Sequence, residues 1–172
     1  MSSLINRHPA QLDTSNLDVI PIEKFKTMGM TDHEVDLKQW RLQVTGAVQH
    51  SLELTYTQLL ELPTIEKNVL LICPGVFTNH GRWKGISVME LLNMAGAQQG
   101  ITHVSFRGPA GRHSKRKRFA FNEIASKKIF LAYEVNGKVL PGKHGFPLRV
   151  VAEDHFGDEW VKYVHKIEFH GT

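Results

Sequence analysis

The sequence contains a single cysteine, Cys73, and this scarcity excludes two classes of protein. A lone thiol cannot form an intramolecular disulfide, so the chain is not a disulfide scaffold. A zinc site built on several cysteines is excluded as well, and no His-Glu-x-x-His motif is present. The role of the thiol therefore has to be inferred from the rest of the chain.

Other familiar signatures are missing too. No apolar stretch approaches the roughly 18 residues of a membrane-spanning helix, and residues 1–21 lack the basic-then-apolar layout of a signal peptide. Neither Gly-x-Gly-x-x-Gly nor a Walker loop occurs, so nucleotide binding is not indicated. Repeats and linkers are also absent, and we expect residues 1–172 to form one domain.

Alternating apolar and polar residues predict a protein built mainly of strands. Asn136-Gly137 is a strong hairpin signal. Strands are expected at 40–45, 52–54, 68–73, 101–107, 129–135, 148–152 and 161–169, and helices at 55–62, 88–95 and 122–125. Residues 1–36 are expected to wrap the surface as irregular chain, and residues 74–85 to form a loop. This pattern predicts an α+β domain with mixed sheets and a few short helices.

Cys73 ends an apolar run, residues 69–73, and Pro74-Gly75 turns the chain directly after it. A thiol at the point where a buried strand surfaces is well placed to bind a metal cofactor. An inert buried cysteine is the usual fate of a free thiol. A third interpretation is a nucleophile with His80 or His144 as its base, which requires a lowered thiol pKa.

Three polar clusters interrupt the apolar pattern: Asn6-Arg7-His8, the stretch from Cys73 to Gly85, and His144 to Arg149 with Trp160-Val161-Lys162 beyond it. Glycine in such clusters lets backbone approach a ligand closely. Arg149 is suited to bidentate binding of a phosphate, and Lys162 adds a point charge.

Residues 112–118 carry five fixed positive charges in seven residues. Such a stretch is typical of a nucleic-acid or anionic-membrane contact, or of a solvated loop. The flanking residues supply no interleaved aromatics for base stacking, which favours the solvated loop.

From residue 40 onward, the chain resembles the molybdopterin-binding domain of the sulfite oxidase family, which includes the catalytic subunits of bacterial methionine sulfoxide reductases. Residues 40–46 resemble its opening strand. Residues 71–73, 81–85 and 88–96 resemble its molybdenum-ligand segment. The most specific stretches are Leu131–Pro141, His144–Val151 and Trp160–Lys162.

The resemblance implies a role for each cluster. Cys73 would be the thiolate ligand of molybdenum, in line with the softness of the metal site. His144 and Arg149 would hold the pterin and its phosphate, and further cofactor contacts would come from Trp160, Val161 and Lys162. Asn6, Arg7 and His8 resemble the family's N-terminal anchor. Asn79, His80 and Arg82, with the basic residues 112–118, would form the substrate mouth.

The chain also departs from the family. Its oxidases usually read Cys-x-Gly-Asn-Arg-Arg where this chain reads Cys73-Pro-Gly-Val-Phe-Thr-Asn-His80, so the arginine near their substrate is missing. An acidic residue of those enzymes is replaced around Pro109–Gly111. These differences argue against sulfite specificity. No immunoglobulin-like dimerisation domain or haem domain accompanies the sequence, which predicts a minimal, monomeric unit.

The resulting hypothesis is a molybdenum-cofactor oxidoreductase that transfers an oxygen atom to or from a small oxyanion or sulfoxide. It would exchange electrons with a separate partner such as a cytochrome and bind no nucleic acid. The resemblance implies a periplasmic location, and a cytoplasmic one is the alternative. Two other functions stay open: a non-catalytic or cofactor-free domain of the same fold, and a nucleic-acid-binding module that uses residues 112–118.

Overall fold

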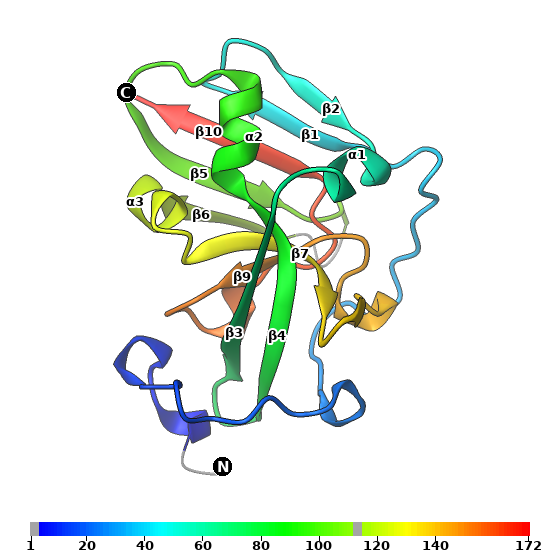
Figure 1. Ribbon diagram of the computed structural model, residues 1–172, viewed down its shortest axis with the longest axis vertical. Coiled ribbons are helices and arrows are strands. Elements are labelled where there is room, and N and C mark those ends of the chain that lie inside the picture. The colour runs from blue at the N-terminus through cyan, green and yellow to red at the C-terminus, as the bar shows by residue number, and fades with distance from the viewer. Residues whose placement is uncertain (1–3, 112–114) are drawn as a thin grey trace.

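The computed structural model describes residues 4–111 and 115–172, which form two five-stranded sheets around one continuous apolar core (Figure 1). The core takes buried side chains from both sheets, among them Leu42 and Phe106 of one and Trp83 and Leu131 of the other. The α+β class with a few short helices is confirmed.

The first sheet has the order β2-β1-β10-β5-β6. Its strands are β1 (Leu42–Gly46), β2 (Leu52–Leu54), β5 (Ile101–Arg107), β6 (Arg116–Ala120) and β10 (Lys166–Gly171). All neighbours are antiparallel except β1 and β10, which run parallel. Alternate residues such as Val104, Phe106 and Ile167 face the core, whereas most residues on the other side of the strands are at least partly exposed, with Ser105 as an exception.

The second sheet has the order β3-β4-β7-β8, with β9 on the other edge of β7. Its strands are β3 (Thr64–Cys73), β4 (Phe77–Ser87), β7 (Ile129–Val135), β8 (Lys138–Val139) and β9 (Arg149–Ala152). Strands β3 and β4 form a long hairpin in which Cys73 pairs with Phe77 at the tip. Asn136 and Gly137, both at positive φ, form the predicted turn between β7 and β8.

In the described parts of the chain, three α-helices connect these strands: α1 (Tyr56–Leu60), α2 (Val88–Ala95) and α3 (Phe121–Ala125). The side chain of Thr55 caps α1 and that of Ser87 caps α2, while Gly96 at φ 75° ends α2. Helix α2 buries Leu91 and Leu92 in the shared core. No helix among the described residues is long and apolar enough to cross a membrane.

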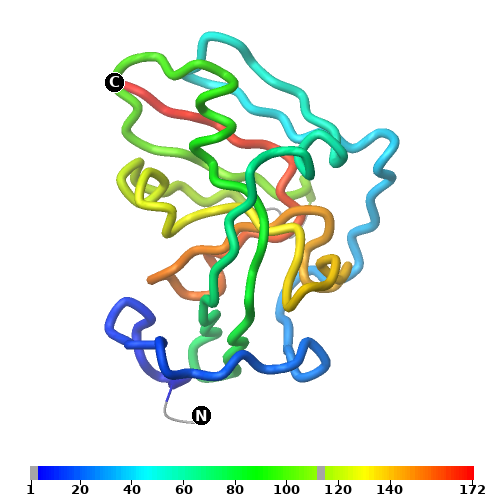
Figure 2. The backbone as a smooth tube through the Cα atoms, in the orientation of Figure 1, coloured from blue at the N-terminus to red at the C-terminus, as the bar shows by residue number. Residues whose placement is uncertain are grey.

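The N-terminal segment crosses the second sheet at the tip of the β3–β4 hairpin and then rises along one side of the molecule to β1 (Figure 2). Its described part holds three short 3-10 helices, η1 (Leu4–Asn6), η2 (Pro9–Gln11) and η3 (Ile22–Lys24), and no strand. Phe25 anchors it, since its ring is buried in the core against Trp83. Asn79 fixes the next residue, because its amide accepts from the Lys26 N–H and donates to the Lys26 carbonyl.

Three sequence-based predictions of local structure are wrong. Residues 112–118 are expected in a solvated loop, but residues 116–118 belong to β6, which pairs with β5. Residues 77–85 are expected in a loop, but they form most of β4, because the whole stretch pairs with β3 and its last part, from Trp83 onward, also pairs with β7. Residues 161–165 are expected in the last strand, but β10 starts only at Lys166. Tyr163, in the middle of residues 161–165, adopts φ 57°, which is incompatible with an extended strand. Its side chain is nonetheless buried.

Candidate functional site

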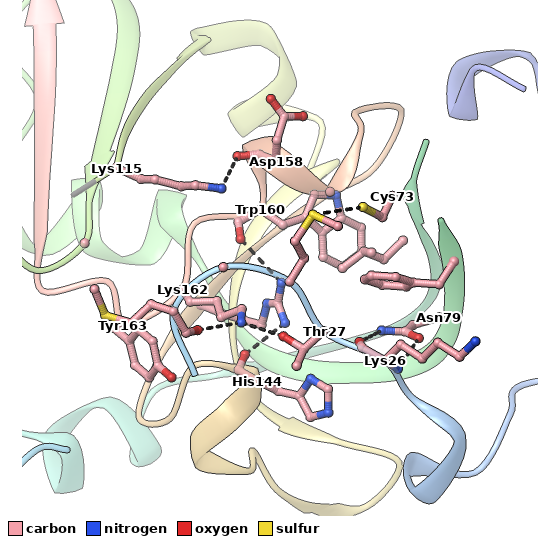
Figure 3. A pocket seen from close by; sticks show the side chains of 18 of the residues that line it. Lys26, Thr27, Cys73, Asn79, Lys115, His144, Asp158, Trp160, Lys162 and Tyr163 are labelled. Carbon is pink, nitrogen blue, oxygen red and sulfur yellow. Dashed lines mark hydrogen bonds between the residues drawn. The ribbon is translucent and has the colours of Figure 1, made fainter. Parts of the chain in front are cut away.

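A cavity of about 270 Å³ lies at the end of the second sheet (Figure 3). Five parts of the chain line it: residues 26–30, the β3–β4 hairpin, the connection after β5, the turn before β9, and residues 157–163. The lining residues that carry the argument are Cys73, Asn79, His144, Arg149, Trp160 and Lys162. Of the twelve individual residues predicted for the site, the structure therefore brings these six together.

Arg149, the first residue of β9, is buried to 3% exposure. Its guanidinium donates to the His144 carbonyl at 2.9 Å and to the Trp160 carbonyl at 3.4 Å. It packs against two indoles that contact each other, 5.3 Å from the ring centre of Trp83 and 5.7 Å from that of Trp160. These contacts fix the guanidinium as a cation–π partner inside the protein.

No described carboxylate pairs with Arg149, and its Nε has no hydrogen-bond partner among the described residues. Burial lowers its pKa to about 10, so it remains protonated at neutral pH. A buried charge without a counter-charge is costly, unless a ligand supplies the missing anion. The geometry around Arg149 is therefore that of an anion site.

His144 stands beside Arg149 and is 1% exposed. Its Nε2 has no partner in the described structure, and its ring lies edge-on to Phe25 with centroids 5.7 Å apart. Burial, together with smaller contributions from the positive charges of Arg149, Lys143 and Lys162, lowers its pKa to about 4, so the ring is neutral at pH 7. A neutral imidazole can donate or accept one hydrogen bond at Nε2.

Gly145 brings these groups close together. It adopts φ 114°, and a Cβ here would lie only 3.1 Å from the Lys162 Cβ and 3.2 Å from the Arg149 Cβ. Lys162 donates to Thr27 Oγ1 at 2.6 Å, to the Met30 carbonyl at 2.7 Å and to the Lys143 carbonyl at 3.0 Å. Burial, together with smaller contributions from the positive charges of Arg149 and Lys115, lowers the pKa of Lys162 to about 7. Through its hydrogen bonds to Thr27 and Met30, the Lys162 side chain ties the N-terminal segment to the cavity wall.

Cys73 is partly buried at the tip of the β3–β4 hairpin, with its Sγ 3.8 Å from Met28 Sδ. Burial raises its thiol pKa, and Asp158 raises it further against a smaller lowering by Lys115. A raised pKa argues against a nucleophilic thiolate, because the thiol is then protonated at neutral pH. His80, one of the two proposed bases, binds the Asp18 carbonyl through Nδ1 instead.

The pairing of β3 with β4 decides which residues of β4 reach the cavity. Phe77 lies opposite Cys73 and Asn79 opposite Leu71, and all four line the cavity. Because successive side chains of a strand point to opposite faces, His80 and Arg82 lie on the other face. Consistent with this, Arg82 forms an exposed ion pair with Glu66 at 2.9 Å. Only Asn79 of the three predicted mouth residues lines the cavity.

The remaining predicted residues lie elsewhere. Asn6, Arg7 and His8 are exposed and do not line the cavity, although the Ile5 carbonyl accepts from Gly75 N just after Cys73. Val161 is buried, and its carbonyl accepts from Val150 N. In the basic stretch, residues 112–114 lie outside the described residues, Lys115 lines the cavity, and residues 116–118 belong to β6.

Sequence reasoning missed one whole wall of the cavity. Residues 26–30, here called the strap, cross the cavity and are held by Asn79 and Lys162 from distant parts of the chain. No periodicity marks the strap, because it forms no helix or strand. Its only local signal is Gly29, which adopts φ 81°.

A histidine clamp fixes the opposite wall, which contains Gly157 and Asp158 of η5 (Gly157–Glu159). His155 contacts Glu159 through Nδ1 and Glu123 of α3 through Nε2, each at 2.6 Å. Burial by itself lowers the pKa of His155, but the two carboxylates outweigh it and the net shift is upward. The His155 ring therefore joins η5 to α3, and the two carboxylates favour its protonated form.

Three comparisons with known proteins bear on this site. The family model described as "Oxidoreductase molybdopterin binding domain" matches residues 28–172. The chain is 31% identical to a nitrate reductase [NADH] of Solanum lycopersicum, in a match that covers 74% of this chain. It is 29% identical to a nitrate reductase [NADH] of Brassica napus, in a match that covers 86% of this chain. It spans only 17% and 19% of those two relatives.

Among solved structures, the chain is similar to the sulfane dehydrogenase SoxCD of Paracoccus pantotrophus, with a TM-score of 0.75. The match covers 81% of this chain and 40% of that one, at 23% identity. At this identity the likeness bears on the fold, and it agrees with the sulfite-oxidase-type architecture expected from the sequence.

Proposed function

Because this chain belongs to the family of molybdopterin-binding oxidoreductase domains, we propose that the cavity holds a molybdenum–molybdopterin cofactor and serves oxygen-atom transfer on a small oxyanion or sulfoxide. The observation that carries the proposal is the buried guanidinium of Arg149, which has no carboxylate partner among the described residues.

The donor set suits such a cofactor. Arg149 offers a free Nε–H to a phosphate, and the unpartnered Nε2 of His144 offers one further hydrogen bond to the pterin. Lys162 lies on the same wall, and because its pKa is about 7 it adds a partial positive charge there at neutral pH, which a bound anion would increase. An anionic phosphate would also restore the charge balance that the buried guanidinium lacks.

Cys73 would be the protein ligand of molybdenum, on the cavity wall formed by the hairpin tip. The raised thiol pKa is no obstacle to this role, because a bound metal cation deprotonates a coordinating thiol. When bound, the cofactor supplies the two-electron chemistry. The chain's own residues orient it, and the strap and the Trp160 ring exclude water from one side of Arg149.

The substrate class follows from charge and from the relatives. Lys26, Lys115 and Lys162 line the cavity and face one carboxylate there, Asp158. A cationic mouth concentrates small anions. Nitrate, the oxyanion in the names of the relatives, is therefore the first substrate to test, followed by sulfite and a dialkyl sulfoxide.

Cofactor retention tests the proposal directly. Protein made in a cofactor-competent host should carry about one molybdenum and one pterin per chain. Arg149→Met should lower both at least about tenfold, as expected when a charged hydrogen bond is lost. Arg82→Met, on the far face of β4, is the matched control and should keep both. Equal retention in the two variants would contradict the proposed anion site.

Cys73→Ser tests the ligand separately. Pterin, which is held by other residues, should remain, while turnover with nitrate, sulfite or sulfoxide and a viologen dye should fall by at least about two orders of magnitude. Unchanged metal content and turnover would refute the assignment of Cys73. Bound pterin without a Mo(V) signal on reduction of the wild-type protein would instead identify a non-catalytic domain.

A further inference from the structure

The outer face of the first sheet is polar and basic, whereas its inner face is packed in the core. The strand registers place Lys166, Arg107 and Arg116 in one row across β10, β5 and β6, and Glu168, Ser105 and Arg118 in the next. Residues paired in this way point to the same side of a sheet. We call the outward side of these two rows the basic face.

The charge of the basic face is unbalanced. Across β10, β5 and β6 it presents four cations, Arg107, Arg116, Arg118 and Lys166, against one described carboxylate, Glu168, which pairs with Arg116 at 3.3 Å. The first row continues through β1 to the carboxylate of Glu53 in β2, so the excess of positive charge lies at the β10-β5-β6 end of the sheet. The three arginines are exposed. Burial lowers the pKa of the neighbouring His170, and Arg118 and Arg116 lower it further while Glu168 opposes them, as expected in a positive field. Such a surface attracts an anionic partner.

The composition of the basic face distinguishes between kinds of anionic partner. Its described outward residues are arginine, lysine, serine and glutamate, with His103 and His170 in the next row. It offers no outward aromatic side chain on which a base of single-stranded nucleic acid would stack. A flat, hydrogen-bonding, cationic sheet surface fits the acidic surface of another protein better.

The basic face lies next to the cavity. Strand β5 ends at Arg107 and its partner β6 begins at Arg116. The adjacent residues in the chain, Gly108 and Lys115, line the cavity. A shallow surface hollow adjoins the same end of the sheet. Its lining includes His165 and Gln43, and Gln43 pairs with Lys166 of the basic face. Tyr163 and Pro109 line both the hollow and the cavity. Figure 3 shows Lys115 and Tyr163 on the cavity side nearest the strands of this sheet.

We propose that the basic face and the adjoining hollow dock an acidic one-electron carrier protein, which exchanges electrons with the cavity across the wall formed by Tyr163 and Pro109. This inference rests on the proposed function. Transfer of an oxygen atom from water to a substrate releases two electrons and two protons, and the reverse reaction consumes them. A one-electron carrier therefore takes or delivers one electron at each of two encounters, while the protons exchange with water.

The experiment compares two double variants with the same change in net charge. Arg107→Glu/Arg118→Glu reverses two exposed charges on the basic face, and Lys24→Glu/Lys138→Glu reverses two exposed charges elsewhere. None of the four residues lines the cavity. The probes are the soluble domain of cytochrome b5, an acidic haem protein, the basic cytochrome c, and a single-stranded oligonucleotide. Binding is titrated at low and high ionic strength, and turnover is measured with each cytochrome and with a viologen dye.

We expect the acidic cytochrome to bind the wild-type protein, with affinity falling as salt is raised. The basic-face variant should weaken this binding and the cytochrome-linked turnover at least about tenfold relative to the control variant. Dye-linked turnover should be the same in all three proteins, since a small dye needs no docking surface.

Equal effects of the two double variants on cytochrome binding would overturn the inference, as would tighter binding of the oligonucleotide or of the basic cytochrome. Absence of dye-linked turnover in the wild-type protein would overturn the proposed function instead. Binding of the acidic cytochrome is measured without turnover, so it reports on the basic face in either case.

Discussion

At the scale of single residues, Arg149 sets a conflict between stability and ligand binding. Its guanidinium is buried against Trp83, Trp160 and two backbone carbonyls at the cavity wall, so the protein bears the desolvation of a charge that a ligand in the cavity would neutralise. Residues kept for binding rather than for stability are expected to show this pattern.

A prediction follows for the cofactor-free protein. Arg149→Met should raise its free energy of unfolding by about 1 kcal/mol or more, because an apolar side chain of similar length replaces an unpaired buried charge. Urea denaturation of the cofactor-free wild-type and variant proteins measures the difference. A variant less stable than the wild type would show that the two hydrogen bonds of Arg149 outweigh its desolvation.

Sequence reasoning reached Cys73, His144, Arg149 and Lys162 because they stand in short motifs with unusual chemistry. It could not reach Lys26 or Thr27, which are ordinary residues in an irregular segment. Their place at the cavity depends on partners 53 and 135 residues away, and no local pattern encodes such contacts.

At the scale of elements, the β3–β4 hairpin shows why a prediction of secondary structure matters for a site. Read as a loop, residues 77–85 offer Asn79, His80 and Arg82 equally to a ligand. As strand β4, they alternate between two faces, and only Asn79 lines the cavity. The glycines and polar residues that suggested a loop have a different cause. Gly85 lies where β4 and β7 approach closely, beside a register shift.

Gly85→Ala should therefore destabilise the protein by about 3 kcal/mol, since an added Cβ would collide with the backbone of Leu131 and Ala132. Gly142→Ala is the control, because a Cβ there meets no atom within 4 Å and its φ is not positive. Thermal unfolding of both variants measures the effect, and equal stability would show that β4 and β7 can separate at no cost.

The His155 clamp predicts a dependence of stability on pH. The folded-state pKa of His155 is raised, so the stabilisation is fully present below its unfolded pKa and is lost as pH rises through the folded pKa. His155→Gln should remove about 1 kcal/mol at pH 6, after screening by solvent, and less at pH 8. His50→Gln, an exposed histidine, is the control. A loss that is the same at both pH values would exclude a charged clamp.

At the scale of the whole molecule, the cavity is assembled from parts that span most of the described chain, from Lys26 to Tyr163. Unfolding of any wall therefore releases the ligand, and ligand binding stabilises the entire domain. The sequence predicted the strand-rich α+β class from alternation, but not which strand ends meet, because that depends on long-range pairing such as β1 with β10.

This coupling predicts a large thermal shift. A ligand present at about 1,000 times its dissociation constant adds about 4 kcal/mol, which corresponds to roughly 8–16 °C for a domain of this size. Cofactor-loaded protein should melt higher than cofactor-free protein by such an amount in differential scanning fluorimetry. The Arg149→Met variant, prepared in the same two ways, should show no such difference, and a shift of equal size in both would place the cofactor elsewhere.

The strap also sets an order of events during synthesis. Lys26 and Thr27 leave the ribosome early, yet one of their anchors, Lys162, lies 135 residues after Thr27. The strap is therefore fastened only after nearly all of the described chain has been translated and the last cavity wall has formed. Until then, the cavity is open on the side that the strap later covers. This interval gives a bulky cofactor a route of entry that the finished fold restricts.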